Sequence, residues 1–150
     1  MSPAGGAVSD THAIACACGA RRALARGAPD SVTWCHCGDC RRESGAPAFA
    51  WVGWREDVVE AVAGGGLSDL ALRETRPGVT RGRCAGCGAT LAYRDRGLPG
   101  MVYVPLGAHG RIDDLVPTEH AYWPERPAWL VVADGLPTRD TTTQERVAAR

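Results

Sequence analysis

The stretch Cys35-His36-Cys37-Gly38-Asp39-Cys40 places three cysteines within a short segment of the chain. Residues i and i+2 of an extended strand point to the same side, so Cys35 and Cys37 direct their sulfurs toward one point. The pair Gly38-Asp39 favours a turn that brings Cys40 back to that point. These three sulfurs can bind one zinc ion, whose fourth tetrahedral position is then left for water or substrate.

The other four cysteines lie in Cys16-Ala17-Cys18-Gly19 and Cys84-Ala85-Gly86-Cys87-Gly88. The second group has the spacing of a zinc knuckle, which needs two further ligands from elsewhere in the chain. Cys16 and Cys18 are the two cysteines left over, so we expect a closed, structural zinc site on Cys16, Cys18, Cys84 and Cys87. The sequence therefore predicts two Zn²⁺ ions per chain as cofactors.

Disulfides are the alternative use of these seven cysteines. An odd count argues against full pairing, and two cysteines as close as C-x-C rarely bridge each other. The segment Met1–Gly6 has neither the basic nor the apolar part of a signal peptide, which predicts a reducing, cytoplasmic location. No stretch approaches the roughly 18 apolar residues of a membrane span, so no membrane partner is expected.

The three-cysteine site has a second interpretation, in which a protein side chain closes it and both zinc sites are structural. His36, His120 and Asp39 are the candidates for a fourth ligand. His36 lies between two ligand cysteines on a strand and should point away from them. Asp39 lies in a loop beside the site and could reach it.

An open zinc on three thiolates would carry a net charge of −1, which makes it a weaker Lewis acid than zinc on neutral histidines. Such a soft site suits a thiol that loses its proton and attacks a neighbouring aldehyde. Cys35, Cys37 and Cys40 are therefore the candidate catalytic centre. Asp39, His36 and Glu43 are the nearest candidates for proton handling, although Asp39 could equally cap a helical turn.

The rest of the chain predicts an all-β, antiparallel domain of short strands, because 19 glycines and 10 prolines punctuate it. The expected strands are His12–Cys16, Ala20–Arg26, Val32–Cys35, Ala48–Trp54, Val58–Ala63, Leu70–Glu74, Ala89–Arg94, Met101–Pro105 and Trp129–Val132. Helical patterns are confined to Asp39–Ser44 and the tail Thr143–Arg150. We expect a mobile N-terminus over 1–11, one zinc-binding domain over 12–137 and a tail over 138–150.

Charge gives no reason to expect nucleic acid as a partner. Seventeen basic residues, all arginine, balance 17 acidic ones. A nucleic-acid-binding zinc ribbon would instead carry a basic face.

The order and spacing of all seven cysteines from about Ile14 to Trp129 resemble the glutathione-dependent formaldehyde-activating enzyme family, which includes the centromere protein V type. The resemblance covers Cys16-Ala17-Cys18-Gly19-Ala20, the run Cys35–Gly45 and Arg81–Gly88. It implies a compact β-tent fold, with the two zinc sites divided four and three as above. It also implies a carbon–sulfur lyase-type activity that joins formaldehyde to the thiol of glutathione as S-hydroxymethylglutathione.

The chain departs from the family pattern in two places. His109 and Gly110 stand where a Leu-Asp pair is usual, and Arg83 stands where an aromatic residue precedes the C-x-x-C. Neither is a metal ligand. The expected partners are a small thiol and an aldehyde; the alternative function is a non-catalytic zinc module that binds a protein. The sequence does not predict an oligomeric state.

Overall fold

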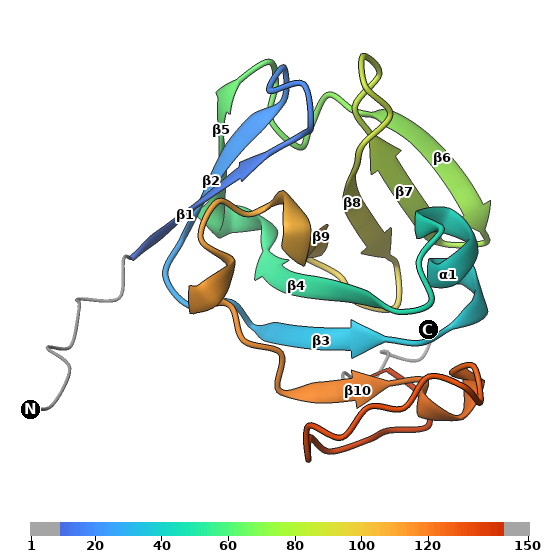
Figure 1. Ribbon diagram of the computed structural model, residues 1–150. Helices are drawn as coiled ribbons and strands as arrows, with labels where there is room; N and C mark the ends of the chain where they lie inside the picture. Colours follow the sequence, from blue (N-terminus) through green and yellow to red (C-terminus); the bar gives the residue numbers. More distant parts are fainter. Residues whose placement is uncertain (1–9, 143–150) are drawn as a thin grey trace, which may run out of the picture.

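The computed structural model describes residues 10–142, which form a mostly β structure with one short helix (Figure 1). The ten strands of this region make two sheets, one of three strands and one of seven. The prediction of an all-β domain is confirmed. None of the helices in residues 10–142 has the length and apolar character needed to cross a lipid bilayer.

The smaller sheet has the strand order β1-β2-β5 and is antiparallel throughout. Its strands are β1 (Thr11–Ala15), β2 (Arg22–Arg26) and β5 (Val59–Ala63). β1 and β2 form a hairpin in which Thr11 lies opposite Arg26 and Ala15 opposite Arg22. The loop that closes this hairpin therefore contains the first pair of cysteines.

The larger sheet has the order β10-β3-β4-β9-β8-β7-β6. Its strands are β3 (Ser31–Cys35), β4 (Phe49–Arg55), β6 (Ala71–Arg76), β7 (Val79–Arg83), β8 (Thr90–Asp95), β9 (Met101–Pro105) and β10 (Glu119–Ala121). Neighbouring strands run antiparallel, except that β10 lies parallel to β3.

Helix α1 (Gly38–Ser44) follows β3 directly and agrees with the helical turn predicted over Asp39–Ser44. It ends at Gly45, whose φ of 75° lies in the left-handed region and whose N–H donates to the carbonyl of Arg41. Glycine adopts this conformation at no steric cost, so Gly45 is a good helix stop. The short helix packs against β4 and brings Cys40 back toward Cys35 and Cys37.

Strand β4 lies in the middle of the molecule and is covered on both faces. Val52 and Trp54, which alternate along one face, belong to the main hydrophobic core shared by both sheets. Trp51 on the other face belongs to a separate cluster with Cys35 and Cys40. A single strand thus separates the general core from the side chains around the sulfurs.

Three elements differ from the sequence predictions. β7 and β10 were not predicted, because the polar Thr80-Arg81-Gly82 and the short Glu119–Ala121 show no apolar alternation. The strand predicted over Trp129–Val132 is wrong. That segment is irregular, Trp129 is 72% exposed and Val131 is 84% exposed, and no strand within residues 10–142 pairs with it.

The predicted tail helix over Thr143–Arg150 lies outside the described residues, as does most of the predicted mobile N-terminus. The division of the chain at 12 and 137 stays a prediction.

Candidate metal centres and the adjoining pocket

Four cysteines from the two sheets meet in one cluster. Cys16 and Cys18 come from the β1–β2 loop, and Cys84 and Cys87 come from the loop between β7 and β8; their four sulfurs all lie within 4.8 Å of one another. The sulfurs of Cys16 and Cys18 are 3.6 Å apart, and those of Cys18 and Cys84 are 3.8 Å apart. A tetrahedral zinc with Zn–S bonds of about 2.3 Å needs S–S distances of about 3.8 Å. The cluster therefore fits a four-thiolate zinc.

Backbone N–H groups already surround the sulfurs of this cluster. The N–H of Arg21 donates to the Cys16 sulfur at 3.2 Å, and this bond is the main cause that lowers the pKa of Cys16 to about 6. The backbone N–H of Ala89 likewise lowers the pKa of Cys87. Because metals bind thiolates rather than thiols, these donors favour the metal-binding form of Cys16 and Cys87, whereas the neighbouring sulfurs raise the pKa of Cys18 to about 11.

The other three cysteines meet at the junction of β3 and α1. Cys35 ends β3, Cys37 caps the N-terminus of α1 and Cys40 lies inside the helix, and their sulfurs lie within 4.8 Å of one another. The sulfur of Cys37 accepts the backbone N–H of Cys40 at 3.3 Å. Cys35 and Cys40 are buried and Cys37 is half-buried. The predicted grouping of the seven cysteines into four and three is thus present in the structure.

No histidine or carboxylate among residues 10–142 joins these three sulfurs at ligand distance. His36 and Asp39, which were predicted as candidates for a fourth ligand and for proton handling, lie beside the cluster but interact elsewhere. The Asp39 carboxylate pairs with Arg76 at 3.4 Å and with Arg42 at 3.8 Å. Within the described residues the protein therefore supplies three ligands to this site.

His36 points away from the sulfurs into a buried chain of polar side chains. Its Nε2 lies 2.8 Å from Nδ1 of His120, and Nε2 of His120 donates to Asp134 at 2.9 Å. Burial lowers the pKa of His36, and the ring of Trp123 packs on both imidazoles. These contacts attach β10 and the segment after it to β3. Both histidines thus hold the fold together behind the cluster.

Negative charge in the three-cysteine cluster is concentrated on Cys40. Its pKa is lowered to about 3, first by hydrogen bonds from Cys35 and Cys37 and then by Trp51 and Arg81. The pKa of Cys35 is raised, because its thiol donates to these neighbours and is buried. The first thiolate of the cluster therefore forms at Cys40, and a bound cation would be needed to hold all three as thiolates.

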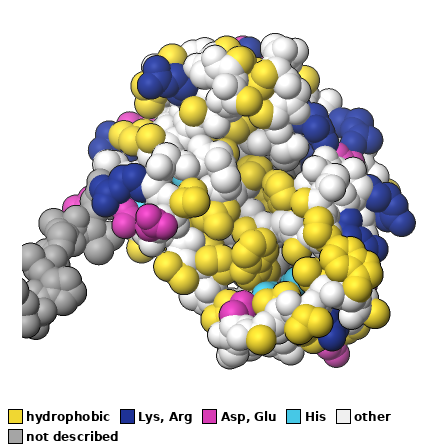
Figure 2. Space-filling view, in the orientation of Figure 1, with side chains coloured by type: hydrophobic (Ala, Val, Ile, Leu, Met, Phe, Trp, Pro, Cys, Tyr) yellow, Lys and Arg dark blue, Asp and Glu magenta, His cyan; other side chains and the backbone are white. Residues whose placement is uncertain are grey.

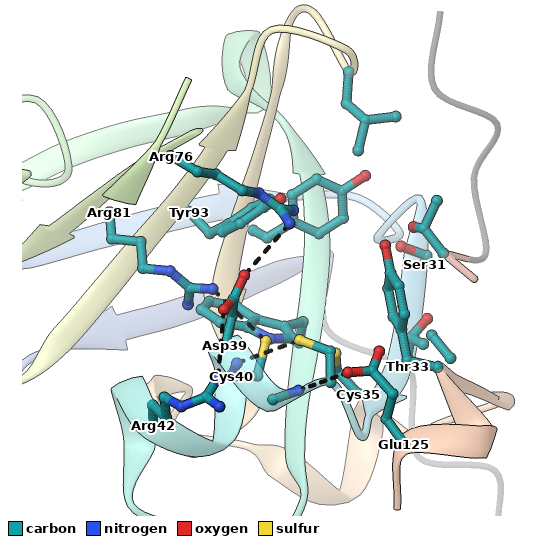
Figure 3. Close-up of a pocket in the computed structure, with 18 residues that line it drawn as sticks. Ser31, Thr33, Cys35, Asp39, Cys40, Arg42, Arg76, Arg81, Tyr93 and Glu125 are labelled. Carbon is teal, nitrogen blue, oxygen red and sulfur yellow. Dashed lines mark hydrogen bonds and ion pairs between the residues drawn. The ribbon is translucent and has the colours of Figure 1, made fainter. Parts of the chain in front are cut away.

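The three sulfurs form part of the wall of a cavity of about 200 Å³ (Figure 3). Aromatic side chains make up much of the remaining wall, and polar groups come from several elements. The side chains of the wall, besides the cysteines, include Ser31, Thr33, Asp39, Arg42, Trp51, Arg76, Arg81, Tyr93, Leu98, Tyr103, Tyr122, Glu125 and Thr142. The Thr33 hydroxyl is buried without a hydrogen-bond partner in the described protein, so a polar ligand could bond to it.

The outer surface of the molecule also groups its side chains by type. Figure 2 shows apolar side chains gathered in the hollowed centre of one face, with arginines along the edge near α1 and β6. Two of the pocket's arginines, Arg42 and Arg76, are well exposed, with side-chain exposures of 79% and 44%. A ligand that entered the pocket would meet cations at the rim and aromatic rings inside.

Other predicted residues lie away from the cavity. Glu43 is not part of its wall and instead forms ion pairs with Arg73 and Arg83. His109, at one of the positions that depart from the family pattern, is buried in the core. Its Nε2 accepts the indole N–H of Trp54 at 3.1 Å. This position therefore belongs to the core, and His109 is not part of the cavity wall.

Sequence reasoning missed Arg81 and Glu125, which the fold brings to the cavity from β7 and from the 3-10 turn Trp123–Glu125. The Glu125 carboxylate accepts the backbone N–H of Gly38 at 3.2 Å, between two of the cysteines. Tyr122 beside it has a φ of 54°, which is uncommon for a residue other than glycine. Arg81 lies at the start of the stretch Arg81–Gly88 that carries the family resemblance, but nothing in its spacing assigned it a role at the site.

These features define a small β protein with two cysteine clusters, each suited to zinc. Residues 11–125 match the family profile described as glutathione-dependent formaldehyde-activating enzyme. The chain belongs to this family.

The chain is similar to a solved crystal structure of a Rhodobacter sphaeroides protein, with 21% sequence identity and a TM-score of 0.49. The aligned region covers 64% of this chain and 85% of the Rhodobacter sphaeroides chain. No curated protein matches the chain.

Proposed function

We propose that Cys16, Cys18, Cys84 and Cys87 hold a structural zinc and that Cys35, Cys37 and Cys40 hold a second, catalytic zinc. Support comes from the sulfur spacing in the first cluster and from the contrast in surroundings between the two. The four-sulfur cluster has a complete ligand set, whereas the three-sulfur cluster faces a cavity. A zinc ion with three thiolate ligands would supply an electrophilic position that favours a soft sulfur ligand.

The reaction that we infer is the addition of a thiol to an aldehyde, such as glutathione to formaldehyde, or its reverse. The sulfur of the deprotonated thiol forms a bond to the carbonyl carbon, and the π electrons of the C=O bond move to oxygen. That oxygen takes up one proton, so the thiol and formaldehyde give S-hydroxymethylglutathione with no atom lost. Family membership supports this class of reaction.

The side chains of the cavity would bind and orient these reactants. The Thr33 hydroxyl can donate to the oxygen that gains charge, because it has no partner in the described protein. Asp39 and Glu125 are the carboxylates in the wall and can carry the proton between thiol and alkoxide. Arg42 and Arg76 at the exposed rim suit the carboxylates of glutathione.

The observation that carries the proposal is the missing fourth ligand. The three sulfurs lie close together, and no other described side chain lies at ligand distance from them. The same sulfurs also line a cavity, which leaves room for a ligand that is not part of the protein. Structural zinc sites are almost always closed by four protein ligands, whereas catalytic sites keep one position open.

The proposal is tested by measuring exchange between formaldehyde and glutathione by NMR, with and without the zinc-loaded protein. We expect faster exchange with the wild-type protein and no acceleration with Cys40→Ser. Absence of acceleration by the wild type would contradict the reaction and favour the non-catalytic, protein-binding zinc module. Elemental analysis of the native protein should give two zinc ions per chain.

A further inference from the structure

Arg81 is a buried cation in direct contact with the three-cysteine cluster (Figure 3). It is only 4% exposed, and its Nη2 donates to the sulfur of Cys40 over 3.8 Å. Its guanidinium carbon lies 5.0 Å from the centre of the Tyr93 ring and 5.9 Å from that of Trp51. Two aromatic faces and one sulfur therefore hold the guanidinium at the inner wall of the cavity.

Within the described residues this arginine lies outside every ion pair, although its charge also acts on Glu43, which pairs with Arg73 and Arg83. Among residues 10–142 no Asp or Glu forms an ion pair with it, and its Nε and Nη1 are buried without a hydrogen-bond partner. Arg42 and Arg76 in the same cavity wall differ, because both pair with Asp39. An unpaired buried charge is costly, so Arg81 requires an anion. The sulfur of Cys40 is the acceptor that it contacts.

The net charge of the metal-loaded site depends on whether Arg81 is included in the sum. Three thiolates and one Zn²⁺ sum to −1, and a substrate thiolate would bring a second negative charge into the same small space. The guanidinium cannot lose its charge in a protein and brings the sum of thiolates, metal and Arg81 to zero. Burial strengthens this effect, because water screens charges less inside the protein.

We propose that Arg81 is a positioning residue that offsets the negative charge of Cys35, Cys37 and Cys40 and so allows the thiolate of a substrate to enter the pocket. This role rests on the proposed function, since it requires a metal at the three sulfurs and an anionic thiol substrate. It also explains why a cation with two unpaired donors is kept inside an aromatic wall: its partner is the charge of the cluster as a whole.

The test compares an anionic with a neutral ligand in the cobalt-substituted full chain, in which sulfur-to-cobalt absorption reports ligand binding. The two probes are 2-mercaptoethanol, which binds as its thiolate, and imidazole, which binds neutral. Arg81→Met keeps an unbranched, flexible side chain but is shorter than arginine and removes the charged guanidinium. We expect this variant to bind 2-mercaptoethanol on the order of 10- to 100-fold more weakly and imidazole within about twofold of wild type.

The matched control is Arg55→Met, which removes a cation from an exposed ion pair with Asp57 outside the cavity. Both ligands should bind this variant as they bind the wild type. Equal weakening of both ligands by Arg81→Met, or no weakening of the thiol, would overturn the proposal, because a packing role does not distinguish anionic from neutral ligands.

If Arg81→Met loses the metal of the three-cysteine site, metal content becomes the readout. Charge compensation predicts that Arg81→Lys keeps this metal and that Arg81→Gln loses it, whereas the same loss in both overturns the proposal.

The binding test also separates the role of Arg81 from the proposed reaction. If thiol binding depends on Arg81 but the protein shows no turnover, only the thiol–aldehyde chemistry is contradicted. If the protein turns over but Arg81→Met binds the thiol as the wild type does, only the role of Arg81 is contradicted.

Discussion

The two cysteine clusters differ in what surrounds them. In the four-sulfur cluster, Cys18 and Cys87 are exposed and the ligands come from loops of two separate sheets. In the three-sulfur cluster, all ligands come from one short segment, and the neighbours are aromatic rings, a cavity and the buried Arg81. The first arrangement joins distant parts of the chain, and the second presents sulfurs to a ligand. This difference in surroundings is the basis for proposing a structural role for the first cluster and a chemical role for the second.

The largest difference is expected between two variants that each replace one cysteine by serine, one in each cluster. Cys84→Ser opens the cluster that joins the sheets, and we expect an unfolded chain, because a structural zinc contributes about 10 kcal/mol, as much as the whole stability of a small domain. Cys40→Ser should remain folded and contain one zinc. Circular dichroism and metal analysis measure both outcomes. Equal unfolding of the two variants would mean that both zinc sites are structural.

Removal of metal by a chelator should proceed in two steps. The site with three protein ligands and an open face should release its zinc first, without loss of far-ultraviolet circular dichroism. The four-thiolate site should release its zinc more slowly, and the fold should be lost with it. Zinc release is followed with a chromogenic chelator alongside the circular dichroism signal. A single step in which fold and both ions are lost together would contradict the separation of roles.

His109 makes the protein sensitive to acid without belonging to either cluster. Burial lowers its pKa to about 4, so the folded protein resists a proton that the unfolded chain accepts near pH 6.5. Its contribution to stability is complete above pH 6.5 and declines as the pH falls toward 4. The expected loss is about 2 kcal/mol between pH 7 and pH 5.

Urea unfolding at the two pH values measures this loss, and His109→Gln serves as the comparison because its amide does not titrate. The variant should lose correspondingly less stability between pH 7 and pH 5. An identical pH dependence in both proteins would assign the acid sensitivity to other groups, such as the cysteines or His36, whose pKa burial also lowers.

The smallest effect is expected at Glu43, which lies on α1 close to Cys40 in sequence but outside the cavity. Its partly exposed ion pairs with Arg73 and Arg83 predict a stability loss of about 1 kcal/mol for Glu43→Gln. Turnover should stay within about twofold of wild type. Thermal unfolding and the NMR exchange assay measure the two quantities, and a tenfold loss of turnover would restore Glu43 as a candidate for proton handling.

The cysteines could be grouped from sequence because local geometry determines C-x-C and C-x-x-C spacing. Arg81 could not be found in this way. Its strand, β7, shows no apolar alternation, and it faces Cys40 only because the sheet order β9-β8-β7 brings it there. His36, His120 and Asp134 are likewise separated by 84 and 14 residues, so their contact depends on the parallel pairing of β10 with β3.

The four-sulfur cluster also bears on how the chain reaches its native state. Cys18 and Cys84 are 66 positions apart, so closing this cluster carries an entropy cost that the proposed zinc ion would help to offset. Under zinc starvation a cell would therefore accumulate unfolded polypeptide, open to proteases, rather than a folded but inactive protein. Zinc supply would then limit the amount of folded protein before it limited the activity that we propose for it.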